Sequence, residues 1–145
     1  MSTLVGIFLH EEKTKLPRSV DSAAIHVAGG IEGDSHADEP RRNRRVLVTD
    51  AETLRAEGLE PGDLREQLAV EGLAVDQLES GSMMKIGDAV AEVIGRCAPC
   101  LTIGGYLGVV DNEAFRDSLE GKRGMFVLFS EGKRIAVGDS VSVLG

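Results

Sequence analysis

Residues 85–93 read KIGDAVAEV, and residues 135–144 read IAVGDSVSVL. In both stretches an apolar residue, a glycine and an aspartate precede an alternating run, which contains Val90 and Val93 in the first stretch and Val141 and Val143 in the second. A Gly-Asp turn followed by alternation is typical of a β-hairpin with every second side chain on a core face. The two stretches therefore predict two hairpin-like units in the second half of the chain.

The rest of the chain adds short strands and a few helices. Apolar segments predict strands over 4–9, 23–27, 46–48 and 125–129. Helices are expected over 50–58, after the turn in LEPGDLREQL (59–68), and over 112–119. In the first of these helices Asp50 would be the N-cap and Gly58 the stop; Pro61 and Asp63 would begin the second.

The order of these segments decides the fold class. About seven strands, which gather late in the chain, lack the regular helical crossovers of a doubly wound sheet. We therefore expect a β-rich α+β fold, a closed or nearly closed β-barrel with two or three peripheral helices.

Composition and charge limit the function. The 145 residues, 42% of them hydrophobic, suit a single domain over 1–145. The net charge of −8 argues against a nucleic-acid partner. No stretch approaches the roughly 20 apolar residues of a membrane span, and the N-terminus lacks the pattern of a signal peptide. We expect a cytoplasmic protein without a membrane partner, in which thiols stay reduced.

A local positive cluster stands out in this acidic chain. Four arginines fall within five positions, at Arg41, Arg42, Arg44 and Arg45. The fixed fork of an arginine matches phosphate and carboxylate oxygens, so the cluster suggests a small anionic ligand. The glycine-rich segment 29–38 before it predicts a loop whose main-chain N–H groups approach that ligand. A solvated basic loop that pairs with Asp38 and Glu39 is the alternative.

Both cysteines lie in IGRCAPC, residues 94–100. Zinc is disfavoured because a structural site needs four ligands and the histidines show no second pair at ligand spacing. A redox dithiol is possible, although the glycine-rich segment after Cys100 is a poor helix start. A third interpretation is one thiolate ligand to a soft metal, with Arg96 lowering the thiol pKa and Pro99 stiffening the loop. The fourth is a pair of small buried apolar side chains.

Taken together, five blocks of the sequence resemble a MOSC domain. They are residues 29–38 (GGIEGDSHAD), 44–54 (RRVLVTDAETL), 58–73 (GLEPGDLREQLAVEGL), 84–100 (MKIGDAVAEVIGRCAPC), and 123–127 with 135–144. The family is named for the C-terminal part of molybdenum cofactor sulfurases and includes amidoxime-reducing components and bacterial reductases of N-hydroxylated bases. The resemblance implies a β-barrel, a molybdopterin ligand and, in the active relatives, two-electron reduction of N–O bonds.

The resemblance also implies roles for individual residues. Cys100 looks like the family's molybdenum-ligating cysteine, and Cys97 like the extra cysteine of many short bacterial members; we count both as candidate catalytic residues. Arg96 beside them is a candidate cofactor contact. The block that resembles the lining of the cofactor pocket contains Gly33, Asp34 and His36.

Further arginines complete the expected site. The terminal phosphate of the cofactor would meet Arg41, Arg42 and Arg45, with Arg45 as the favoured contact. Arg65 resembles the family's arginine at a helix start, where side chain and helix N-terminus together suit an oxyanion. Gln67 stands where asparagine is common, and the extra methylene puts a cofactor contact there in doubt.

The predicted function is that of a molybdopterin-binding domain in which the Cys100 thiolate holds molybdenum and N-hydroxylated substrates are reduced. Electrons would come from a separate redox protein, because the chain has no nucleotide-binding glycine loop and no four-cysteine iron–sulfur set. The alternative is a non-catalytic carrier of the cofactor or of a sulfur atom on Cys97 or Cys100, served by a separate sulfur donor. A folded remnant without cofactor is a third possibility, since 3% aromatic content leaves few groups to stack on a pterin.

Overall fold

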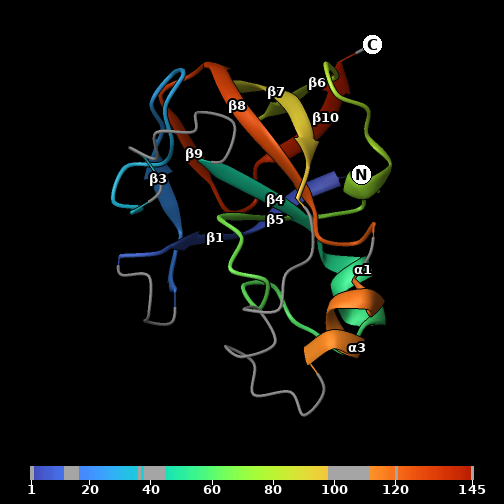
Figure 1. Cartoon of the computed structure of the whole chain (residues 1–145). Helices are drawn as coiled ribbons and strands as arrows, with labels where there is room; N and C mark the ends of the chain where they lie inside the picture. Colours follow the sequence, from blue (N-terminus) through green and yellow to red (C-terminus); the bar gives the residue numbers. More distant parts are fainter. Residues whose placement is uncertain are drawn as a thin grey trace.

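The computed structural model describes residues 2–11, 17–35, 37, 45–97, 112–119 and 121–144. This part of the chain contains ten strands, two short α-helices and one 3-10 turn. Figure 1 shows how they are arranged. The elements are β1 (Ser2–Leu9), β2 (Arg18–Val20), β3 (Ser22–Ala24), β4 (Val46–Asp50), α1 (Ala51–Ala56), β5 (Leu68–Glu71), η2 (Val75–Gln77), β6 (Met83–Ile86), β7 (Ala89–Arg96), α3 (Asn112–Ser118), β8 (Met125–Glu131), β9 (Arg134–Ala136) and β10 (Ser140–Leu144).

Seven of the strands close into a mixed barrel. Their order is β10-β6-β7-β8-β4-β5-β1, and β1 returns to β10 with Ser2 opposite Val141. The β4–β5 pair is parallel, while the other pairs of the barrel are antiparallel. β2 extends the sheet beyond β1. The expected β-rich barrel of about seven strands is confirmed.

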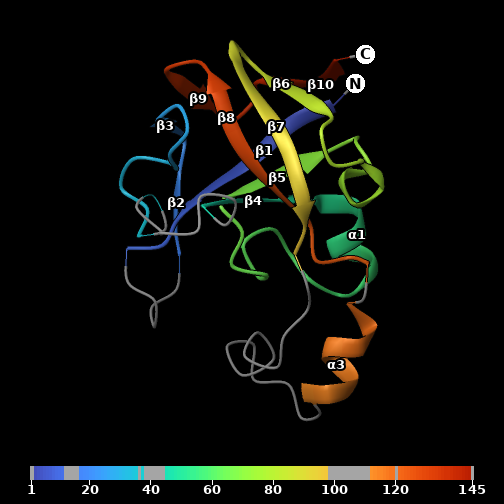
Figure 2. The same cartoon turned by 45° about the horizontal axis from the view of Figure 1, so that its top comes forward.

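Apolar side chains from every barrel strand fill the interior. β4 is buried along its whole length, and the core beside it includes Leu4, Val48, Val127 and Phe129. A smaller cluster of Leu54, Leu64 and Leu119 joins α1, the turn before β5 and the end of α3. Both views show α1 and α3 next to one another beyond one end of the barrel (Figures 1 and 2). Neither described helix is long and apolar enough to cross a membrane.

Helix α1 begins and ends as its sequence predicts. The Asp50 carboxylate accepts hydrogen bonds from the backbone N–H groups of Glu52 and Thr53 at 3.0 and 3.3 Å. After the helix, Gly58 adopts a φ of +76°, a left-handed conformation that suits glycine and ends the helix. α3 likewise lies within the stretch expected to be helical.

The second expected helix, in 59–68, is wrong: residues 61–64 form turns that lead into β5. The Asp63 carboxylate accepts from the N–H of Glu60, three residues earlier, at 2.8 Å instead of capping a helix, and Arg65 has a φ of +59°. Leu64, Glu66 and Leu68 are all buried. Residues 66–70 are buried without interruption, which suits a chain running into a strand that is covered on both faces, not a short helix with one exposed face. This tertiary requirement overrides the local helix signal.

The two hairpin-like units have different outcomes. β6 and β7 form the expected hairpin, with Lys85 opposite Val90. β9 and β10 do not pair with one another: β9 pairs with β3, with Ala23 opposite Ile135, and β10 pairs with β6 and β1. Closing the barrel requires β10 to bond on both sides, which leaves no edge for β9.

The expected core faces of these units are only partly correct. Val93 and Val141 are buried, whereas Val90 is half-buried and Val143 is 40% exposed. Ala89, Ala91 and Val93 are the alternating buried positions of β7, so Val90, three residues before Val93, lies on the opposite face.

Candidate functional site

A pocket of about 440 Å³ lies beside β3 and the start of β4. Its wall is made by residues 26–29 and 32–34, together with Ala37 and Arg45. The structure thus brings together Gly33, Asp34 and Arg45, three residues that the sequence picks as cofactor contacts. His36, Arg41 and Arg42 lie outside the described residues.

A tight backbone turn forms one side of this pocket. The His26 N–H donates to the Gly30 carbonyl at 3.0 Å, and the Gly29 N–H donates to the His26 carbonyl at 2.9 Å. The Ala28 N–H donates to the Phe129 carbonyl at 2.8 Å. The turn is therefore fixed to β8 and to the barrel wall.

Arg45 and Gly33 complete the wall from opposite ends of the same loop region. Arg45 Nη1 donates to the Ala28 carbonyl at 2.8 Å, which holds the guanidinium against the turn. Gly33 has a φ of +90°, and a Cβ there would lie 3.2 Å from Leu9 Cδ1. A side chain at this position would be strained, so the wall here is bare backbone.

Asp34 lines the pocket and also connects the pocket loop to His10 and Gln67. Its two carboxylate oxygens accept from the His10 N–H at 2.8 Å and from Gln67 Nε2 at 3.3 Å. The other end of the Gln67 amide accepts from the Leu47 N–H at 2.8 Å. A chain of buried hydrogen bonds thus joins the pocket loop to β4. Gln67 is 3% exposed, and its amide bonds to the Leu47 backbone and to the Asp34 side chain.

The cysteine-bearing segment, residues 97–100, begins beside the start of β8, whereas the pocket turn is bonded near the end of that strand. The Cys97 N–H donates to the Gly124 carbonyl at 3.0 Å, whereas the pocket turn bonds to Phe129. Five residues of strand separate these two points, which corresponds to about 17 Å. Cys97 is half-buried and Arg96 is exposed. Cys100 lies outside the described residues, so the thiolate-ligand role stays a prediction.

Arg65 is not at a helix start, because the helix expected there is absent. It follows the turn of residues 61–64, and its N–H donates to the Gly62 carbonyl at 3.1 Å. An oxyanion site that depends on a helix N-terminus at Arg65 is therefore wrong. The side chain as a cofactor contact stays a prediction.

Glu66, which the sequence interpretation placed in a helix, is fully buried, with 0% of its surface exposed. Its Oε2 accepts from Thr49 Oγ1 at 2.6 Å and from the Gly62 N–H at 3.0 Å. The other oxygen of Glu66, Oε1, is buried without a hydrogen-bond partner among the described residues, and so are Nε and Nη1 of Arg123. Burial raises the pKa of Glu66, against the hydrogen bonds from Thr49 and Gly62 and the charge of Arg123.

Asp76 is a second buried carboxyl, on η2 and near the cysteine-bearing segment. Its Oδ1 accepts from the Gly124 N–H at 2.8 Å. Burial raises its pKa and the charge of Asp50 adds to this, while the Gly124 hydrogen bond and the charge of Arg96 lower it. Burial also raises the pKa of Asp50, although this residue caps α1.

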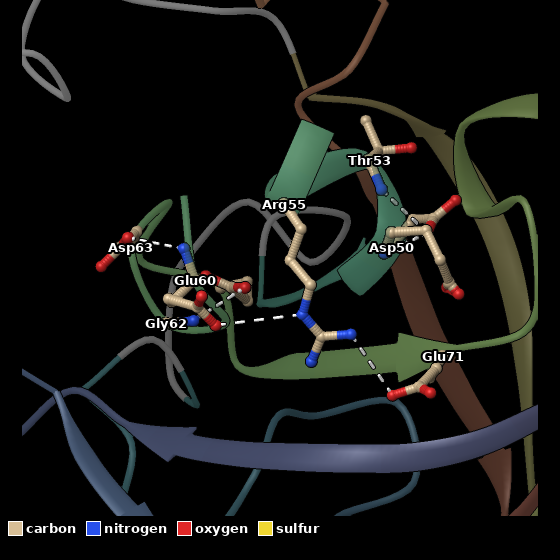
Figure 3. Close-up of polar contacts among 9 residues, drawn as sticks. Asp50, Thr53, Arg55, Glu60, Gly62, Asp63 and Glu71 are labelled. Atoms are coloured by element: carbon tan, nitrogen blue, oxygen red, sulfur yellow. Dashed lines mark hydrogen bonds and ion pairs between the residues drawn. The ribbon is translucent and has the colours of Figure 1, made fainter. Parts of the chain in front are cut away.

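Figure 3 shows how α1 is tied to its surroundings on the outer side. Arg55 lies between Glu60 at 3.9 Å and Glu71 at 3.6 Å. Its side chain is 48% exposed, so these ion pairs add little stability. They connect the helix to Glu60, just before the turn of residues 61–64, and to β5.

Sequence reasoning missed Glu66 and Asp76. Glu66 begins the buried run 66–70, and the apolar residues 68–70 that follow it are a signal that could have predicted a buried strand there. Asp76 has no local signal, since its partner lies 48 residues away. Among the described residues, no group of three or more His, Cys, Asp or Glu side chains could hold a metal ion.

The sequence model of the MOSC domain matches residues 42–142. The chain belongs to the MOSC domain family. This MOSC domain is similar in fold to the YuaD protein from Bacillus subtilis, with a TM-score of 0.85 and 20% identity over 99% of this chain and 96% of that one. A comparison with curated proteins gives no match.

The fold also matches that of YiiM from two bacteria. The Geobacillus stearothermophilus protein gives a TM-score of 0.76 and 17% identity over 100% of this chain and 76% of that one. The Escherichia coli protein gives 0.71 and 16% over 99% and 70%. At these identities the likeness establishes the fold of this MOSC domain, and its ligand has to be argued from the site.

Proposed function

We propose that this MOSC domain binds a molybdenum cofactor of the molybdopterin type, with one end of the ligand in the pocket beside β3 and with the Cys100 thiolate as a ligand to the metal. With electrons from a separate redox protein it would reduce N-hydroxylated substrates. The observation that carries the proposal is the pocket in which the 26–34 turn and Arg45 meet. Membership of a family linked to this cofactor supports it.

The pocket residues fit the chemistry of a pterin that carries a phosphate. Its volume of about 440 Å³ falls in the ordinary range for small-ligand sites. The amino and ring N–H groups of a pterin need acceptors, which the carboxylates of Glu32 and Asp34 offer at one side. Arg45 offers the positive charge and donors that suit phosphate oxygens. The bare backbone at Gly33 gives a flat ring room to approach.

The protein's own groups would bind and orient the ligand. Arg45, held by the Ala28 carbonyl, is preorganised for an anion. Asp34, fixed by His10 and Gln67, keeps the loop from opening. When bound, the cofactor supplies two-electron redox chemistry at its metal. Arg96 would favour the thiolate over the thiol in the segment that follows it.

Metal and pterin contents test the proposal. The protein is purified from a cofactor-producing host, and its molybdenum is measured by elemental analysis and its pterin by the fluorescence of the oxidised ring. We expect wild type and Cys97→Ala to hold both, and Cys100→Ala to lose molybdenum. Arg45→Ala should lose pterin and metal together, whereas Arg134→Ala, an exposed arginine outside the pocket, should keep both.

Wild-type protein that holds neither molybdenum nor pterin would overturn the proposal. If the cofactor is present, turnover of hydroxylamine-type compounds with an artificial electron donor decides between an enzyme and a carrier. An enzyme reduces the N–O bond under these conditions. A carrier of cofactor or sulfur retains its cargo without turnover.

A further inference from the structure

The start of the cysteine-bearing segment depends on a buried residue far away in sequence. The β7–β8 ladder ends with Arg96 opposite Met125. Beyond it, the Cys97 N–H donates to the Gly124 carbonyl at 3.0 Å. Since Cys97 is the first residue after β7, the position of the Gly124 carbonyl determines where the segment leaves the barrel.

Gly124 is itself held on its other side by Asp76. The Asp76 Oδ1 accepts from the Gly124 N–H at 2.8 Å, and Asp76 is 7% exposed. The two peptide groups that flank the Gly124 Cα are therefore both fixed, one by a carboxylate and one by Cys97. Such a clamp restrains both backbone torsions of the residue between them.

The conformation of Gly124 makes this clamp specific. Its φ is +94°, and a Cβ at this position would meet the Val48 carbonyl oxygen closer than 3.0 Å. The backbone of Gly124 thus lies directly against β4 and has little room to move. In this position its N–H points to Asp76 and its carbonyl to Cys97.

Asp76 also meets the segment through charge. The positive charge of Arg96, the residue before Cys97, acts on the Asp76 carboxyl, and the negative charge of Asp50 opposes it. Two influences of Asp76 therefore converge on the same few residues. One is a hydrogen bond to the Gly124 N–H, and the other is attraction to the side chain next to Cys97.

We propose that Asp76 is a positioning residue for the cysteine-bearing segment and acts on Cys97 through Gly124. This inference deepens the proposed function, and its functional consequence rests on that proposal. An aspartate on the 3-10 turn would hold in place the backbone at Cys97, where the chain leaves β7. No contact between Asp76 and the ligand is required.

Amide hydrogen exchange tests the inference in the full chain without any cofactor. In Asp76→Ala the Cys97 and Gly124 amides should exchange at least about tenfold faster, since a hydrogen bond to a charged group is lost. Asp76→Asn keeps an acceptor oxygen and should restore slow exchange at Cys97. If Asp76→Ala does not fold, Asp76→Ser, whose side chain is too short to reach Gly124, serves in its place.

Asp139→Ala is the matched control. Asp139 Oδ2 accepts from the Ala136 N–H at 2.8 Å, which is likewise a bond from a backbone N–H to a carboxylate, in the turn that joins β9 to β10. This variant should speed exchange at Ala136 and leave Cys97 unchanged. The inference would be overturned if the Cys97 amide exchanged at the wild-type rate in Asp76→Ala. It would also be overturned if Asp76→Ala and Asp139→Ala accelerated exchange at Cys97 equally.

Molybdenum content then separates this inference from the proposed function. If both hold, Asp76→Ala should lose metal from the purified protein while Asp139→Ala and Asp76→Asn retain it. Metal-free wild type with faster Cys97 exchange in Asp76→Ala would reject the proposed function alone. Full metal retention in Asp76→Ala, despite faster exchange, would reject the positioning role.

Discussion

Replacing Glu66 by glutamine should change how the stability of the protein depends on pH. Glu66 is 0% exposed, and burial raises its pKa above the ordinary value of 4.5. Between that value and the raised pKa, the unfolded chain loses the proton while the folded protein keeps it. Stability should therefore fall as pH rises through this window.

The size of the effect follows from the single proton involved. Within the window the free energy of unfolding of wild type falls by up to about 1.4 kcal/mol per pH unit from Glu66. Below pH 4.5 Glu66 is protonated in both the folded and the unfolded chain, so it costs no stability there. Above the raised pKa it is ionised in both, so the loss of stability no longer grows with pH. Because glutamine cannot titrate, the free energy of unfolding of Glu66→Gln rises relative to that of wild type by up to this amount per pH unit. The pKa values of Asp50 and Asp76 are raised as well, and each causes a similar loss of stability with rising pH. These losses are the same in wild type and in Glu66→Gln, so they cancel when the two free energies of unfolding are subtracted.

Urea unfolding of wild type and Glu66→Gln at several pH values between about 4 and 8 measures this difference. The pH trend is the observable, because the cost of burying the glutamine amide is the same at every pH. Glu79→Gln, which alters an exposed carboxylate, is the control and should follow the wild-type trend. A difference between Glu66→Gln and wild type that stays constant over this range would refute the reasoning.

Two further substitutions test the packing around the site. Gly124→Ala should lower the free energy of unfolding by at least about 3 kcal/mol in urea titration. The new Cβ would clash with the Val48 carbonyl, and the φ of +94° is strained for any residue but glycine. A loss below about 1 kcal/mol would contradict the close contact. Gln67→Asn should cost about 1–3 kcal/mol by thermal unfolding, since the shorter amide cannot reach both the Leu47 N–H and Asp34 and leaves a buried group unsatisfied. An unchanged melting temperature would show that the bridge is dispensable.

Local sequence patterns located most of the elements. The strand expected over 4–9, the buried strand from Val46 and the apolar run from Met125 are all strands of the barrel. Asp50 and Gly58 mark the ends of α1 as expected. These signals are local because capping groups, turn glycines and burial on one face act within a few residues.

Strand partners were beyond the reach of such patterns. Both Gly-Asp stretches look like hairpins, but only β6–β7 is one, and β9 joins β3 instead. Alternation reports which face of a strand is buried and says nothing of the neighbour it bonds to. The same limit applies to residues 59–68, where turns that lead into β5 stand in place of the expected helix.

The candidate site divides in the same way. The family resemblance, the glycine-rich turn and the choice of Gly33, Asp34 and Arg45 all came from the linear sequence, and the structure gathers these three residues at one pocket. The Gln67–Asp34 hydrogen bond, the burial of Glu66 and the contact of Asp76 with Gly124 beside Cys97 became visible only in the folded chain. A buried polar group is stable only with partners that folding brings to it from distant positions, and a linear pattern carries no record of those partners.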